Sequence, residues 1–228
     1  MLGNAPLGMH EPPLPCTSPP WLRCPAATGT VHGRGSGITP LEGRVERVSL
    51  LVVCTGNASR SVMAGLMLDR LAARHGVGLS VTTAGTHAVD GLPLGARTLA
   101  ALRAVPELAG GEAGALALSL AASHRSSQLC DEHLRRADVV VVMEAGHVRH
   151  VRRRHPEAAA RTAMLRWLVR HLVPGSAPLA ARVAALGLEH VEVDPADDVA
   201  DPAGHDDAAY AACAAELWSL CEELVPRL

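Results

Sequence analysis

The most constraining feature of this sequence is a short apolar run that leads directly into a polar loop and then into a helix. The run VSLLVV (48–53) is continuous and rich in β-branched residues, which is typical of a strand buried on both faces of a sheet. The loop CTGNASRS (54–61) follows, and residues 62–75 carry apolar side chains at helical spacing. A strand, a loop and a helix in this order predict an α/β fold built on a parallel sheet.

The remainder of the chain repeats this alternation. Apolar runs predict further strands at 79–85, 138–143 and 162–165, whereas the Gly/Ala-rich stretch 106–117 is predicted to be a loop. Helices are expected at 93–104, 129–136, 144–154, 179–186 and 208–224. We therefore expect a three-layer α/β/α domain over residues 47–228, with a four-stranded parallel sheet and a Cys-x5-Arg loop after the first strand.

Residues 1–46 differ in composition and hydrophobic pattern from the rest of the chain. They hold eight of the 16 prolines and show almost no hydrophobic periodicity. Such a composition does not bury enough apolar surface to offset the entropy lost on ordering. We expect a flexible N-terminal extension, in which Cys16 and Cys24 have no structural role.

Composition excludes several classes of protein. All 21 basic residues are arginine, so the chain lacks the lysine of a Walker-type nucleotide loop or of a pyridoxal Schiff base. The net charge of −2 gives no indication of nucleic-acid binding, and no apolar run approaches the ~18 residues of a membrane span. The six cysteines form no CxxC pair, and the N-terminus does not read as a signal peptide, so a reducing cytoplasm is expected. The sequence does not indicate an oligomeric state.

The loop after the first strand has the residue types of an anion site. Successive backbone N–H groups that lead into a helix N-terminus bind phosphate, and Gly56 and Asn57 tolerate the positive φ of a tight ring. Arg60 can hold two phosphate oxygens with its planar fork. The same N–H groups, helix dipole and arginine favour the thiolate of Cys54, and the Ser61 hydroxyl can donate to that sulfur. These residues together predict a nucleophilic cysteine beside a bound phosphate.

The structural alternative is a buried cysteine at a strand end and an unrelated arginine at a helix start. The glycine and asparagine between them, and the serine that follows, favour the phosphate site. Residues expected to line this site are Thr55, Gly56, Asn57, Ala58, Ser59 and Ser61.

Several segments resemble the low-molecular-weight protein tyrosine phosphatases. Val53–Ser61 matches the family pattern V-C-x-G-N-x-x-R-S, and TTAGTHA (82–88), SHRSSQL (123–129), ADVVVVME (137–144) and VADP (199–202) follow in the family order. The resemblance covers about 180 residues. It implies a four-stranded parallel sheet and the hydrolysis of phosphate monoesters through a phosphocysteine, with no metal or other cofactor. The partner would be a phosphorylated protein.

The resemblance also implies roles for individual residues. Cys54 matches the nucleophile, Arg60 the phosphate clamp, and Asp201 the general acid that protonates the leaving oxygen. Asp201 has acidic neighbours that could compete for this role, namely Asp194, Asp197, Asp198, Asp206 and Asp207. Its place directly before Pro202, in register with the family, favours Asp201.

Within the cysteine loop, Asn57 and Ser61 match residues that hold the loop and tune the thiolate. His124 matches a histidine that braces the asparagine.

Two departures from the family pattern affect substrate and regulation. The acid segment of the family continues with aromatic residues that flank a phosphotyrosine ring, whereas this chain has Ala203 and Gly204. Many members carry a second cysteine before the arginine, and Ser59 occupies that place here, so the usual protective disulfide is not expected.

Three alternative functions stay open. The missing aromatic residues favour a phosphatase for a small molecule such as a nucleotide or sugar phosphate. An arsenate reductase would need two further cysteines in and after the third strand, but Cys130 is isolated upstream. A phosphate-binding module without turnover would have no need of the acid Asp201.

The segment HVRHVRRRH (147–155) places three histidines and four arginines on a helix. His147 and His150 could share a metal at their i, i+3 spacing, but no other ligand converges on them in the sequence, and no metal site is predicted. We expect a solvated basic face, with a docking patch for an acidic partner as the alternative. The aromatic residues Trp167, Trp218 and Tyr210 are predicted to pack on the core.

Overall fold

The computed structural model of this protein describes residues 47–228. Within this range, four strands form one parallel sheet with the order β2-β1-β3-β4. The strands are β1 (Val48–Cys54), β2 (Leu79–Gly85), β3 (Val139–Val142) and β4 (Thr162–Met164). The predicted four-stranded parallel sheet is thus confirmed. The predicted extension 1–46, with Cys16 and Cys24, lies outside the described residues.

Helices connect the strands and follow the last of them. The α-helices are α1 (Arg60–His75), α2 (Ala96–Ala104), α3 (Pro106–Ala109), α4 (Gly111–Ser123), α5 (Asp131–Arg135), α6 (Ala145–Arg154), α7 (Leu165–His171), α8 (Leu179–Ala184) and α9 (Asp207–Leu224). Short 3₁₀ helices are η2 (Pro156–Arg161), η3 (Pro195–Asp197) and η4 (Val225–Arg227).

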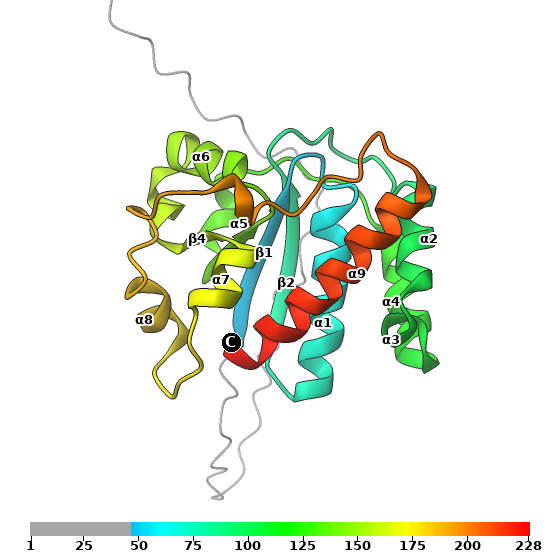
Figure 1. The fold of residues 1–228 in the computed structure, drawn as a ribbon, viewed down its shortest axis with the longest axis horizontal. Helices are drawn as coiled ribbons and strands as arrows, with labels where there is room; N and C mark the ends of the chain where they lie inside the picture. Colours follow the sequence, from blue (N-terminus) through cyan, green and yellow to red (C-terminus); the bar gives the residue numbers. More distant parts are fainter. Residues whose placement is uncertain (1–46) are drawn as a thin grey trace, which may run out of the picture.

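Both faces of the sheet are covered, as a three-layer fold requires (Figure 1). On one face, Leu50 and Val52 of β1 pack in an apolar cluster with α1 and α9, which lie side by side. On the other face, Leu51 and Val53 pack in a second cluster with residues of α5 and α6. Successive strand residues point to opposite faces, which is why the run 48–53 is apolar throughout.

The carboxyl ends of the strands form the edge of the sheet that carries the site. The register pairs Cys54 with Gly85 of β2 and Val53 with Val142 of β3. The chain passes from β1 to β2 on one side and later to β3 on the other, so the strand order reverses at β1. Ligands of open parallel sheets bind at such a point. The segment 194–207, orange in Figure 1, crosses this same end of the sheet.

The stretch 106–117, predicted to be a loop, is helical, so this prediction is wrong. It forms α3 and the first half of α4. Leu108 and Ala121 are buried, and a Cβ added at Gly114 would lie 2.5 Å from the carbonyl carbon of Ala109. Alanine and leucine favour helix, and the close packing of α3 on α4 stabilises it despite the glycines.

Smaller differences concern the start of α2. The predicted helix from Pro93 begins at Ala96, because Pro93 pairs with Arg125 in a short antiparallel bridge. Over residues 47–228, none of the helices combines the length and the apolar character needed to span a membrane.

The predicted packing of the aromatic residues holds. Trp218 on α9 is buried in the larger apolar cluster, and Trp167 and Tyr210 are half-buried against it.

Candidate active site

The loop between β1 and α1 is short and lies directly against β2. β1 ends at Cys54 and α1 begins at Arg60. Asn57 has a φ of 51°, in the left-handed region that non-glycine residues rarely adopt, whereas Gly56, expected to share this conformation, does not have a positive φ. A Cβ added at Gly85 would lie 2.6 Å from the Thr55 carbonyl oxygen. The glycine of β2 is therefore what allows the loop to approach.

The loop uses its carbonyl groups and its N–H groups differently. The carbonyl oxygens of Cys54 and Thr55 accept from the backbone N–H groups of Thr86 and His87, both at 2.9 Å. Ala58 accepts through its carbonyl oxygen from a threonine hydroxyl of α2. In the described part of the chain, none of the backbone N–H groups of residues 56–59 donates to another backbone group. They are available to bind an anion.

A chain of buried polar contacts leads from Asn57 to the sulfur of Cys54. Asn57 Nδ2 donates to Ser61 Oγ (3.0 Å), which lies 3.1 Å from Cys54 Sγ. Because the amide donates to Ser61, the serine hydroxyl hydrogen is free to point at the sulfur and stabilise a thiolate. Asn57 Oδ1 accepts from the backbone N–H of Ser127 (2.8 Å), and His124 Nε2 lies 2.9 Å from the Asn57 carbonyl oxygen. His124 thus contacts the backbone of the asparagine rather than its side chain.

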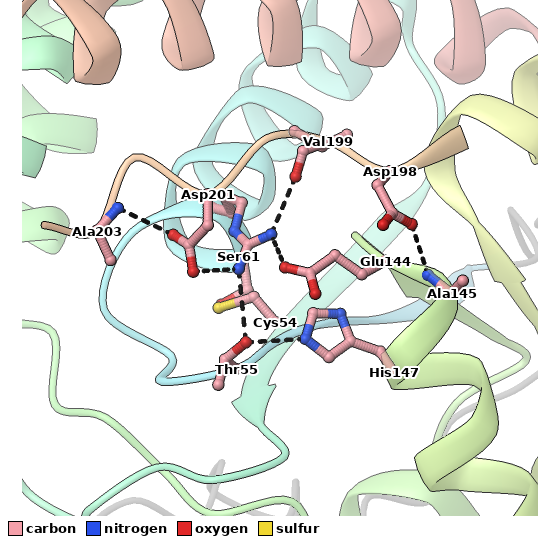
Figure 2. Close-up of polar contacts among 11 residues, drawn as sticks. Cys54, Thr55, Ser61, Glu144, Ala145, His147, Asp198, Val199, Asp201 and Ala203 are labelled. Carbon is pink, nitrogen blue, oxygen red and sulfur yellow. Dashed lines mark hydrogen bonds and ion pairs between the residues drawn. The ribbon is translucent and has the colours of Figure 1, made fainter. Parts of the chain in front are cut away.

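The guanidinium of Arg60 joins the cysteine loop (residues 54–61) to the acid segment (residues 194–207), and its partners Thr55, Val199 and Asp201 lie around it, as labelled in Figure 2. Arg60 is 1% exposed. Its Nη1 forms an ion pair with Glu144 and donates to the Val199 carbonyl oxygen (2.9 Å). Its Nη2 donates to Asp201 Oδ2 (2.6 Å) and makes a longer contact of 3.5 Å with Thr55 Oγ1. A planar group with five N–H donors is suited to hold several acceptors at once.

The acid segment is anchored to the end of β3 and the start of α6. The Val199 N–H donates to the carbonyl oxygen directly after β3 (2.8 Å), and the Ala145 N–H donates to Asp198 Oδ1 (2.7 Å). Asp201 Oδ1 accepts from the backbone N–H of Ala203 (3.1 Å). The side chain of Asp201 is 37% exposed. These contacts hold its carboxylate at the edge of the site while leaving it open to solvent.

The other acidic residues of 194–207 have different partners. Asp197 is buried in an ion pair with Arg170, and Asp207 pairs with an exposed arginine of α2. Asp194 and Asp206 accept from backbone N–H groups at the starts of η3 and α9. Since Asp198 caps α6, Asp201 is the carboxylate of this segment that faces the cysteine loop.

The segment 147–155 is only partly the basic face that was predicted. Its exposed residues include Arg149, Arg153 and Arg154. His147, in contrast, is 4% exposed, and its Nε2 lies 3.0 Å from Thr55 Oγ1. Burial, together with the nearby charge of Arg60, lowers the pKa of His147 to about 4. The prediction of a solvated face is therefore wrong for this residue, because the first turn of α6 points at the site.

Comparison with known proteins identifies the family. Residues 49–177, more than half of the chain, match the family model described as low molecular weight phosphotyrosine protein phosphatase. The chain belongs to the low molecular weight phosphotyrosine protein phosphatase family. It is accordingly a cysteine-based phosphatase.

Individual members of the family are similar over most of their length. A protein-arginine-phosphatase of Geobacillus stearothermophilus is 30% identical over 179 residues, which are 78% of this chain and 95% of that protein. The solved YwlE arginine phosphatase from the same organism has 29% identity and a TM-score of 0.56, with 78% of this chain and 90% of that chain covered. A low molecular weight protein tyrosine phosphatase from T. tengcongensis has a TM-score of 0.58 at 24% identity, with 79% and 99% covered. This last similarity shows the fold.

The mouth of the site differs from the aromatic pattern expected of the family. Ala203 and Gly204 follow the Asp-Pro pair, both are exposed, and Gly204 has a φ of 82°. Ser59 is buried directly before Arg60. The acid segment itself therefore presents a small, open edge to a substrate.

A possible metal-ligand group exists elsewhere on the molecule. Asp131, His155 and Glu157 each offer one ligand atom within 4.8 Å of the others, and His155 Nδ1 lies 2.6 Å from Asp131 Oδ1. This group is at the opposite end of α6 from Glu144, so it is separate from the phosphatase site. His147, considered above as a metal ligand together with His150, contacts Thr55 through its Nε2.

The contacts of Glu144 with Arg60 and of His147 with Thr55 are not among the predictions from the sequence. Glu144 and His147 both follow β3, which is the neighbour of β1 in the sheet. Residues directly after adjacent parallel strands meet at the same edge. This signal was present in the sequence, since both residues come within a few positions of the third apolar run.

Proposed function

We propose that residues 47–228 form a catalytic domain that removes phosphate from phosphorylated protein side chains. Cys54 would be the nucleophile, Arg60 the phosphate clamp and Asp201 the general acid. The observation that carries the proposal is the convergence of loop 54–61 and segment 194–207 on one buried guanidinium.

Phosphate binding follows from the donors of the loop. The N–H groups of residues 56–59 supply hydrogen bonds for the oxygens of a phosphoryl group, and Arg60 would add its own when a phosphate oxygen replaces Asp201 at Nη2. Cys54 lies at the base of this ring of donors, where its sulfur can attack phosphorus from the side opposite the leaving group. The same donors stabilise the charge that develops on the phosphoryl oxygens during transfer.

The reaction then proceeds in two steps. A sulfur–phosphorus bond forms and the bond to the leaving atom breaks, while Asp201 gives its proton to that atom. Water next attacks the phosphocysteine, Asp201 takes back a proton, and Cys54 leaves as a thiolate. The Ser61 hydroxyl, 3.1 Å from the sulfur, stabilises this thiolate in both steps. Each of these roles is filled by a side chain or backbone group of the protein.

Two phosphorylated side chains are candidates for the substrate. The family description supports phosphotyrosine. Phosphoarginine is favoured by the similarity to a protein-arginine-phosphatase and by the open edge at Ala203 and Gly204, which offers no ring to stack on a phosphotyrosine. The loss of such stacking removes about tenfold selectivity at most, so we expect less than about a tenfold preference for phosphotyrosine peptides.

The proposed mechanism is tested with a chromogenic aryl phosphate in the presence of a metal chelator. We expect turnover by the wild-type protein to persist with chelator and to vanish in Cys54→Ser. Cys130→Ser, which changes a half-buried cysteine outside the site, is the matched control and should retain activity. Wild-type protein that binds phosphate without turnover would instead indicate a binding module.

The substrate is tested with matched peptides that carry phosphotyrosine or phosphoarginine, together with a sugar phosphate. A kcat/KM for the peptides well above that for the sugar phosphate would support a protein substrate. The reverse order would indicate a small-molecule phosphatase.

A further inference from the structure

His147 is a buried imidazole that touches the cysteine loop but has no part in the reaction steps described above. It comes from the first turn of α6 and contacts Thr55 at 3.0 Å (Figure 2). Within residues 47–228, its second ring nitrogen, Nδ1, is buried without a hydrogen-bond partner. Burying a ring nitrogen without a hydrogen bond costs free energy, and the contact of Nε2 with Thr55 avoids this cost for the other nitrogen.

Chemistry fixes the direction of the bond between Arg60 and Thr55, whereas the direction of the bond between Thr55 and His147 depends on the tautomer of the imidazole. A guanidinium only donates, so Thr55 Oγ1 accepts in its 3.5 Å contact with Arg60 Nη2. The threonine hydroxyl hydrogen is then free to be donated to His147 Nε2. An imidazole can accept it only in its neutral form, which is the form that prevails here above a pH of about 4.

Thr55 is also fixed through its backbone. Its carbonyl oxygen accepts from the His87 N–H at 2.9 Å, directly after β2. The residue therefore ties the cysteine loop to β2 on one side and to α6 on the other. Without His147, the hydroxyl would be free to rotate, and it would no longer be held toward Arg60 as an acceptor.

We propose that His147 is a positioning residue that fixes the Thr55 hydroxyl and, through it, the guanidinium of Arg60 for phosphate binding. This inference rests on the proposed role of Arg60 as phosphate clamp. His147 itself does not touch the phosphate. Its loss should weaken phosphate binding and raise KM more than it lowers kcat, because the nucleophile and the acid stay in place.

The test compares inorganic phosphate binding by calorimetry with turnover of an aryl phosphate. In His147→Leu, we expect the Kd for phosphate and the KM to rise about tenfold, the effect of losing one hydrogen bond to a charged site. His147→Gln keeps a polar group near the position of Nε2, so it should restore both values to within about threefold of wild type. Thr55→Val should resemble His147→Leu. The double variant should be no worse than either single variant, since the two residues act as one unit.

His150→Leu is the matched control, because it removes an imidazole one turn further along α6 that does not contact Thr55. Its Kd for phosphate should stay within about twofold of wild type, and thermal unfolding confirms that each variant is folded. If His147→Leu does not fold, Thr55→Val and His147→Gln carry the comparison.

Two outcomes overturn the inference: equal phosphate affinity in wild type and in folded His147 and Thr55 variants, or independent, additive losses in the double variant. Failure of the proposed function has a different result, namely wild-type protein that binds phosphate and shows no turnover.

Discussion

Loop 54–61 and segment 194–207 form the two halves of the site, and they are held in place in different ways. In the first, Asn57 and Ser61 are fully buried and bond to each other and to Cys54. In the second, Asp201 is 37% exposed, and the segment is tied down by contacts with β3, α6 and Arg60. In the first half, hydrogen bonds among its own side chains add to the contacts that other segments make with it, whereas the second half is held mainly by contacts with the rest of the fold.

This difference in anchoring affects how many amino-acid substitutions each half of the site can accept. In a loop whose side chains hydrogen-bond to one another, most positions accept only one particular amino acid. A segment anchored at a few points can vary between the anchors, as Ala203 and Gly204 do in this chain. The two halves share Arg60, and a change there should disturb both.

The largest effect is expected for Arg60→Lys. An ammonium is a point charge and cannot hold Glu144, the Val199 carbonyl oxygen and Asp201 in one plane. We expect kcat/KM for an aryl phosphate to fall by about 10³-fold, within the range seen when a preorganised donor is removed. Steady-state kinetics measure this loss.

Arg97→Lys is the control for this substitution, since it changes an exposed arginine that pairs with Asp207. It should leave kcat/KM within about twofold of wild type, as expected for a surface ion pair. Similar losses in both variants would contradict a special role of Arg60.

The second largest effect is expected from a change in the acid segment that leaves the cysteine loop unaltered. Asp201→Asn removes the proposed proton donor and keeps a side chain of nearly the same shape. Turnover should fall by about 10²-fold for alkyl phosphates, whose leaving oxygen needs a proton, and by less than about tenfold for an activated aryl phosphate. A series of leaving groups measures the difference.

Asp194→Asn serves as its control, because asparagine can keep the helix-capping contact that Asp194 makes at η3. An equal loss for all leaving groups in Asp201→Asn would remove this residue from the acid role.

The third effect concerns the side-chain hydrogen bonds of the cysteine loop. Asn57→Ala removes the side-chain contacts with Ser61 and Ser127 and leaves a non-glycine residue at a φ of 51°. We expect the free energy of unfolding to fall by about 2–4 kcal/mol, measured by urea denaturation. Asn57→Gly loses the same contacts without the backbone strain and should lose about 1 kcal/mol less. Equal losses would mean that backbone strain contributes nothing at this position.

The smallest effect is a pH dependence that comes from α6 rather than from the loop. The pKa of His147 is lowered from 6.5 to about 4 by burial and by Arg60. Below pH 6.5 the unfolded chain takes up a proton that the folded chain does not, so this residue costs stability as the pH falls toward 4. The cost reaches at most about 3 kcal/mol.

Thermal or urea unfolding of wild type and His147→Gln at pH 4.5, 5.5 and 7 tests this. The stability of the wild type relative to the variant should decline as the pH falls. A constant difference would show that His147 does not titrate in this way.

The sequence predicts the first half of the site better than the second. Cys54, Asn57, Arg60 and Ser61 all lie within residues 54–61, so one strand–loop–helix pattern places them together. Asp201 was recognisable only from its register with the family, because its neighbour Arg60 is 141 positions away. Contacts between residues so far apart in the sequence are determined by the order of the strands and not by local composition.

Two errors have related physical causes. The helices at 106–117 were missed because their stability comes from the packing of Leu108 and the close contact at Gly114, which local glycine content does not reveal. A run of arginines surrounds His147 in the sequence, and such a run predicts a solvated face. In the fold, only the first turn of α6 faces the sheet edge.

The ion pair between Arg60 and Asp201 has a consequence for the end of the catalytic cycle. The hydrogen that Nη2 donates to the carboxylate, at 2.6 Å, cannot at the same time be donated to a phosphate oxygen. Once Asp201 has released the proton that it would take up in the second step, its carboxylate and inorganic phosphate would compete for this donor. Because this carboxylate is tethered at the edge of the site, its local concentration is high, and its return to Arg60 would favour the departure of phosphate.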